Sequence, residues 1–186
     1  AALLLGTLTA CGDAVSQPDS AATNANSSSS EAAADSADTS GNAAAAGVSF
    51  QFAATAADGS EYILMINGDA DAMQTALGTP SETFEAPSCA FDGTSYTYTY
   101  SGFTVETYPS PDDGSNLIYA ITLKDSSVQT HEGAKVGDSA DTIRSLCGEP
   151  DNETAAYLMY KGEGEGEALQ FFLEGDAVSS IVYTYM

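Results

Sequence analysis

Few residues of this chain have the types and spacing that group-transfer chemistry requires. His131 is the only histidine, in the turn Thr130-His131-Glu132-Gly133, and no serine lies in a Gly-x-Ser-x-Gly pattern. No two His or Cys residues have the spacing of zinc ligands. The stretch Asp112-Asp113-Gly114-Ser115-Asn116 offers oxygen ligands for calcium, but it lacks the full spacing of a calcium loop and is more typical of a solvated turn. We therefore expect no catalytic residue, no metal site, no cofactor and no enzyme activity.

The residues around Cys11 predict a more specific chemistry than any other stretch of the sequence. The stretch Leu8-Thr9-Ala10-Cys11-Gly12 follows an apolar run, Ala1 to Leu5, that is too short to span a bilayer. Small residues before a cysteine, preceded by an apolar segment, resemble the lipobox of bacterial lipoproteins. The resemblance implies that residues 1–11 are part of a lipoprotein signal peptide and that Cys11 carries a diacylglycerol and a further acyl chain such as palmitate. Two acyl chains, at ~0.8 kcal/mol per buried methylene, give stable anchoring.

This anchoring predicts that the mature chain is extracytoplasmic and held to the cell membrane by lipid on Cys11. Outside the cytoplasm the two remaining cysteines, Cys89 and Cys147, can form a disulfide. Cys89 lies in a loop before a strand and Cys147 at an expected helix end, so the pattern leaves a bridge and two free thiols both open.

The charge of the chain excludes one class of partner. Its 27 Asp and Glu residues against 4 Lys and Arg give a formal charge of −23. Such a charge repels the phosphates of nucleic acid and anionic lipid head groups. We therefore expect no nucleic-acid partner and interpret the acidic composition mainly as a source of solubility.

Residues 12–47 have the composition of a disordered linker. They are nearly all Ala, Ser, Asn, Asp, Thr, Gly and Gln, with no aromatic residue, and cannot bury a core. A flexible coil of this length, about 36 residues, spans roughly 30–35 Å. The segment is expected to hold a folded part away from the membrane.

The remainder, residues 48–186, is predicted to fold as two α+β repeats, 48–126 and 127–186. An N-terminal hairpin is expected from Val48–Phe52 and Glu61–Ile66. Gly68–Pro80 and Gly137–Pro150 match each other, and each has an Asp placed to cap a short helix and a Gly-x-Pro end that stops it. The predicted fold class is a tandem repeat of a short helix plus an antiparallel β-meander, with the helices on one face of the sheet, preceded by the disordered stalk.

Each helix is expected to be followed by a polar loop and three strands, and the second helix to be preceded by a strand from Ser127–Thr130 and Ala134–Val136. The six meander strands are recognised by alternating apolar residues. They are Tyr96–Tyr100, Phe103–Tyr108, Leu117–Leu123, Tyr157–Tyr160, Ala168–Leu173 and Val178–Tyr185.

Paired helices that open with Gly-Asp and close with Gly-x-Pro, each before a three-stranded meander, resemble the fold of the β-lactamase inhibitory protein and of small outer-membrane lipoproteins that assist barrel assembly. The stretch Glu85–Gly93, with Tyr98-Thr99-Tyr100 and Thr107-Tyr108-Pro109, is also similar to a group of surface lipoproteins from Gram-positive gut bacteria. The resemblance covers about Glu61 to Met186 and implies architecture. No β-lactamase-binding residue is carried over, because no inhibitory loop motif is matched.

One face of the expected sheet is predicted to bind a partner. When the repeats are aligned, mostly apolar positions face the helices and a mixed set of residues lies on the opposite face. This set is too polar for a core and too apolar for a surface that contacts only solvent. That set is Thr104, Glu106, Thr122, Gln170, Phe172, Val182 and Thr184. An ordinary exposed sheet face is the simpler alternative.

The sequence thus predicts a lipid-anchored extracytoplasmic module that binds an envelope or secreted protein through the open sheet face. A structural accessory lipoprotein of an envelope complex is the first alternative. A hydrolase of wall polymer is a weaker one: the abundant carboxylates can supply a glycosidase-like pair, but they cluster in turns and helix starts.

Overall fold

The computed structural model describes residues 47–163 and 166–186. The chain divides into two units, residues 1–41 and 42–186, and all the described residues belong to the second. The lipobox with Cys11, and the linker up to residue 46, lie outside the described residues.

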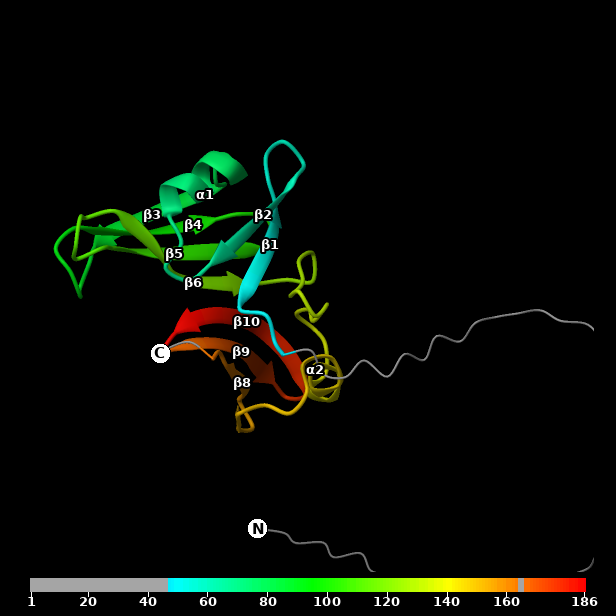
Figure 1. Cartoon of the computed structure of the whole chain (residues 1–186). Coiled ribbons are helices and arrows are strands. Elements are labelled where there is room, and N and C mark those ends of the chain that lie inside the picture. The colour runs from blue at the N-terminus through cyan, green and yellow to red at the C-terminus, as the bar shows by residue number, and fades with distance from the viewer. Residues whose placement is uncertain (1–46, 164–165) are drawn as a thin grey trace, which may run out of the picture. The chain divides into compact units, whose positions relative to one another are not determined.

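The described part is mostly β-structure (Figure 1). A two-stranded sheet pairs β1 (Gln51–Thr55) with β2 (Glu61–Met65). A second sheet has eight strands, each antiparallel to its neighbours. Its order across the sheet is β3 (Glu82–Pro87), β4 (Thr94–Thr99), β5 (Phe103–Pro109), β6 (Asn116–Leu123), β10 (Ala177–Tyr185), β9 (Glu167–Glu174), β8 (Tyr157–Lys161) and β7 (Asn152–Glu153).

The expected fold class, a tandem α+β repeat of helix plus three-stranded meander, is wrong, because the described part is mostly β: an eight-stranded and a two-stranded sheet with only two short helices. β6 pairs with β10, with Leu123 opposite Ile181, so strands from both expected repeats form one continuous sheet. The polar loop expected after the first helix contains the edge strand β3, and the short β7 lies in the second such loop. The strand expected between residues 127 and 136 is irregular instead, closed by a turn in which the amide of Thr130 donates to the carbonyl of Ala134.

Two short helices occur in the described part, α1 (Ala70–Leu77) and α2 (Ala140–Cys147). The carboxylate of Asp69 accepts hydrogen bonds from the first-turn amides of α1, as its sequence indicates. In α2 the cap is Ser139 rather than the expected Asp138, whose carboxylate accepts from the amide of Lys135. Neither helix has the length and apolar character needed to cross a membrane.

Both helices and the β1–β2 hairpin pack on the same face of the large sheet. Phe52 of β1 lies 5.0 Å from Phe103 and 6.2 Å from Tyr183, measured between ring centroids. Met73 of α1 and Ile143 of α2 are fully buried in the same core. Within the described residues, no helix or strand is left to cover the opposite face, called here the open face.

Two β-bulges change which residues point to the open face. In β6 the register shifts so that Glu106 lies opposite Ala120 while Thr107 lies opposite Ile118, which leaves Tyr119 as an extra residue. Ile118 is therefore buried and Tyr119 is 47% exposed. A second shift lies between Val178 and Ser180 of β10.

Candidate binding site

The seven residues expected to form a binding face lie together on the open face. Residues directly opposite each other in neighbouring strands share a face, and the pairing registers therefore define rows across the sheet. One row runs Glu82, Thr99, Thr104, Thr122, Val182, Gln170, Met159, Asn152. The next runs Phe84, Thr97, Glu106, Ala120, Thr184, Ala168, Lys161. Phe172 belongs to a third row, beside Tyr157 and Ser180.

The open face combines small neutral residues with a few large apolar ones. Thr104, Ala120, Met159 and Ala168 are buried although they lie on this face, and Phe172 and Val182 are half-buried. Phe84, which the sequence did not single out, is 64% exposed on the edge strand β3. Glu106 is the only charged side chain among the seven predicted residues.

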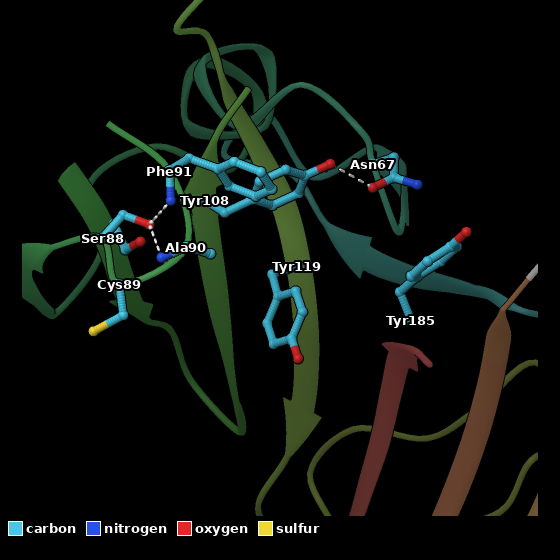
Figure 2. A pocket seen from close by; sticks show the side chains of 9 residues that line it. Asn67, Ser88, Cys89, Ala90, Phe91, Tyr108, Tyr119 and Tyr185 are labelled. Atoms are coloured by element: carbon cyan, nitrogen blue, oxygen red, sulfur yellow. Dashed lines mark hydrogen bonds between the residues drawn. The ribbon is translucent and has the colours of Figure 1, made fainter. Parts of the chain in front are cut away.

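The open face ends in an aromatic pocket of about 580 Å³, shown in Figure 2. Tyr108 of β5, the bulge residue Tyr119 of β6 and Ser95 of β4 line it. Phe91 comes from the β3–β4 loop, and Tyr185 from the end of β10. Asn67, between β2 and α1, and residues 88–90 of the β3–β4 loop complete the lining.

The aromatic rings of the pocket hold one another in place. The centroids of Phe91 and Tyr108 are 5.7 Å apart, and Tyr119 lies edge-on to Tyr108 at 6.4 Å. The hydroxyl of Tyr108 donates to Oδ1 of Asn67 over 2.9 Å. Asn67 has φ of 63°, a left-handed conformation that asparagine tolerates better than most residues, and its amide donates to the carbonyl of Ile118. The Tyr108 ring is thus fixed at both its face and its hydroxyl.

Phe91 is positioned by the fold of its own loop. The hydroxyl of Ser88 accepts from the amides of Ala90 and Phe91, and the amide of Ser88 donates to the carbonyl of Gly93 over 2.9 Å. Gly93 has φ of 131° and packs so closely on Pro109 that a Cβ atom would lie 2.9 Å from the proline ring. The close approach of this glycine to β5 holds the loop against the pocket.

The charges nearest the pocket are negative. None of its lining residues is charged, but residues 88–91 also line a neighbouring hollow together with Asp92, Asp112 and Asp113. Hydrogen bonds from the side chain and amide of Ser115 hold the pKa of the Asp113 carboxyl below its usual value, so this carboxylate stays ionised at neutral pH.

The positive charges of the chain lie elsewhere. Its four Lys and Arg residues are Lys124, Lys135, Arg144 and Lys161, and none lines the pocket. Arg144 of α2 is already paired with Asp141 and Glu153.

In this structure Cys89 and Cys147, considered as a disulfide pair, are both free thiols. Cys89 is exposed in the β3–β4 loop at the rim of the pocket. Cys147 ends α2 and is buried in the core, and this burial, with the charge of Glu132, raises its pKa to about 12. As expected from the sequence, Cys89 lies in a loop before a strand and Cys147 at a helix end. The sequence pattern, however, does not say how far apart this loop and this helix lie.

The residues considered for catalysis or metal binding do not form a common site in the described part of the chain. His131 is exposed in its turn. Among residues 47–163 and 166–186, no group of three or more His, Cys, Asp or Glu side chains is arranged to hold a metal ion. In the Asp112–Asn116 turn, the Asp113 carboxylate accepts from the amide and hydroxyl of Ser115.

Sequence reasoning missed the pocket because its rings come from four separate segments. Strict alternation from the buried Ile121 and Leu123 would turn Tyr119 toward the core, and only the bulge brings it to the open face. A usable signal was the spacing of Phe91 and Tyr108, aromatic residues that each lie beside an expected polar loop.

Comparison of the chain with models of protein families, with curated proteins and with solved structures found no match. The function is therefore inferred from the geometry and chemistry of the open face and its pocket.

Proposed function

We propose that this chain is a lipid-anchored extracytoplasmic binding module that docks a protein partner on the open face of its eight-stranded sheet. The observation that carries the proposal is the grouping of the seven residues in adjacent rows of a face on which no described helix or strand packs. A sheet face this wide is an extended surface for a protein rather than an enclosed site for a small molecule.

The composition of the open face supports this role. The chain has 27 acidic residues, yet from β4 to β9 the first two rows consist of Thr, Ala, Val and Gln, with Glu106 as the one charged residue. The other charged residues of these rows, Glu82 and Lys161, lie toward the two edges of the sheet. Depletion of charge at the centre of a surface, with aromatic and Met side chains present, is the compositional signal of a protein interface. Phe84 at one edge and Phe172 toward the other supply apolar anchors.

Anchoring rests on the sequence around Cys11. The thioether-linked lipid would fix the module to the membrane, and the linker that the composition of residues 12–47 predicts would let the open face reach partners at a distance. The partner in this proposal is an envelope or secreted protein.

The experiment is a capture of partners from detergent-solubilised envelope with the full-length protein. Phe172→Ala and Glu106→Lys change the open face. Ile63→Ala removes an exposed apolar side chain from β2, in the other sheet, and serves as the control. The proposal expects a stoichiometric partner that both open-face variants lose and the control retains.

Capture that is the same for all variants would contradict binding through the open face. Turnover of purified wall fragments by the wild-type protein would instead favour a hydrolase.

A further inference from the structure

The proposed function alone does not explain the aromatic pocket at the end of the open face. A flat sheet interface needs no recess of about 580 Å³. This volume is within the range of ligand pockets, about 300–1,000 Å³, and is large enough for one long side chain with part of its backbone.

The walls of the pocket favour positive charge. Phe91, Tyr108, Tyr119 and Tyr185 present ring faces and edges, and the face of an aromatic ring carries negative electrostatic potential. A cation held over such a face within about 6 Å of the centroid is attracted by the ring. The hydroxyl groups of the tyrosines and Oδ1 of Asn67 add oxygen acceptors, whereas the lining contains no cationic side chain.

The surroundings discriminate between ligand classes. Asp92, Asp112 and Asp113 line the neighbouring hollow together with residues 88–91, and the formal charge of the whole chain is −23. An anion would be repelled by this field, and a neutral sugar would stack on the rings without the net electrostatic attraction that the carboxylates exert on a positive charge. A cation is attracted both by the faces of the aromatic rings and by the carboxylates.

The position of the pocket indicates where the cation comes from. Ser95 and Tyr108 lie two positions along β4 and β5 from Thr97 and Glu106, which belong to the second row of the open face. A partner segment on this face can therefore place one side chain into the pocket. Arginine fits best, because its planar guanidinium stacks on aromatic rings and donates to several oxygens at once.

We infer that the aromatic pocket receives an arginine side chain from a basic segment of the protein partner. This inference rests on the proposed function for the source of the side chain, while the chemistry of the pocket can be tested without the partner.

The test is a titration of the full-length protein with two short blocked peptides, acetyl-Gly-Arg-Gly-amide and acetyl-Gly-citrulline-Gly-amide, followed by tyrosine fluorescence and NMR chemical shifts. Citrulline has the shape of arginine without its charge. The arginine peptide should bind in a saturable manner, and the citrulline peptide at least about 5-fold more weakly. Added salt should weaken binding of the arginine peptide only.

Variants assign the binding to the pocket. Tyr119→Leu should weaken the arginine peptide about 2- to 5-fold by removing one ring, and the double change Asp112→Asn with Asp113→Asn should weaken it without altering the rings. Phe84→Leu changes an exposed aromatic residue of the same face outside the pocket lining and should leave the affinity unchanged. The melting curve of each variant shows that it is folded.

Equal affinity for the two peptides, or no saturable binding of either, would overturn the inference. If the arginine peptide fails while Phe172→Ala still abolishes partner capture, the inference alone is wrong. If the arginine peptide binds while partner capture is unchanged in every open-face variant, the proposed docking is wrong. The assignment of the arginine to a partner is then wrong as well.

Discussion

Replacing Phe171 by alanine should destabilise the fold strongly, whereas the same change at its neighbour Phe172 should not. Phe171 is fully buried on the helix-covered face, lies between Leu158 and Ile181 in the sheet, and meets Tyr160 edge-on at 5.8 Å. Phe172 points to the open face, where it is half-buried beside Tyr157.

The magnitude follows from the burial. A buried phenylalanine removes about 150–250 Å² from water, and at about 25 cal/mol per Å² this corresponds to roughly 4–6 kcal/mol. Alanine keeps part of that burial and the remaining cavity adds a cost, so Phe171→Ala should lower the free energy of unfolding by about 3–5 kcal/mol. Phe172→Ala should lower it by about 1 kcal/mol or less, because solvent already reaches its ring.

Urea unfolding followed by far-UV circular dichroism measures both values. The slope of the unfolding free energy with urea should stay near the wild-type value, so that the midpoint alone moves. If Phe172→Ala unfolds the protein and Phe171→Ala has no effect, β9 is shifted by one residue and the two faces of the sheet must be exchanged.

Three further predictions concern the anchor, the linker and the thiols. Cys11→Ser should abolish labelling of this protein when the cells that produce it are given radioactive fatty acid, and normal labelling would refute the lipid anchor. Limited proteolysis should remove residues 12–47 and leave a core that starts near Val48 and melts with the whole soluble chain; a clear loss of stability would show that the boundary is misplaced. In the Cys11→Ser protein, a thiol reagent at mildly alkaline pH should modify the exposed Cys89 quickly, while Cys147, whose burial raises its pKa to about 12, should react only on unfolding. Two equally fast thiols would contradict the burial of Cys147.

Local patterns predicted the elements of this fold better than their assembly. Caps and glycine stops indicated both helices, because Asp69 and Gly78 act on residues within one turn of themselves. Alternation located the strands that bury one face, such as β5 and β9. It missed β3, an edge strand whose residues are mostly exposed and which ends in Pro87, since such a strand has no apolar face to recognise.

The expected fold class was wrong because the proportion of sheet and the order of its strands depend on contacts between segments far apart in the chain. The pairing of β6 with β10 joins strands more than fifty residues apart, and nothing in either strand distinguishes this partner from another. The aromatic pocket was missed for the same reason, since the bulge at Tyr119 and the loop of Phe91 act together only in the folded chain.

The central claim, that a protein docks on the open face, is tested most directly by the dissociation constant of the captured partner for three forms of the full-length protein. These are the wild type, Phe172→Ala on the open face and Ile63→Ala on the separate two-stranded sheet, each shown to be folded by its melting curve. The account predicts that Phe172→Ala weakens binding by about 10-fold or more, as for an interface anchor, while Ile63→Ala binds like the wild type. Equal constants for all three, or a loss confined to Ile63→Ala, would contradict it.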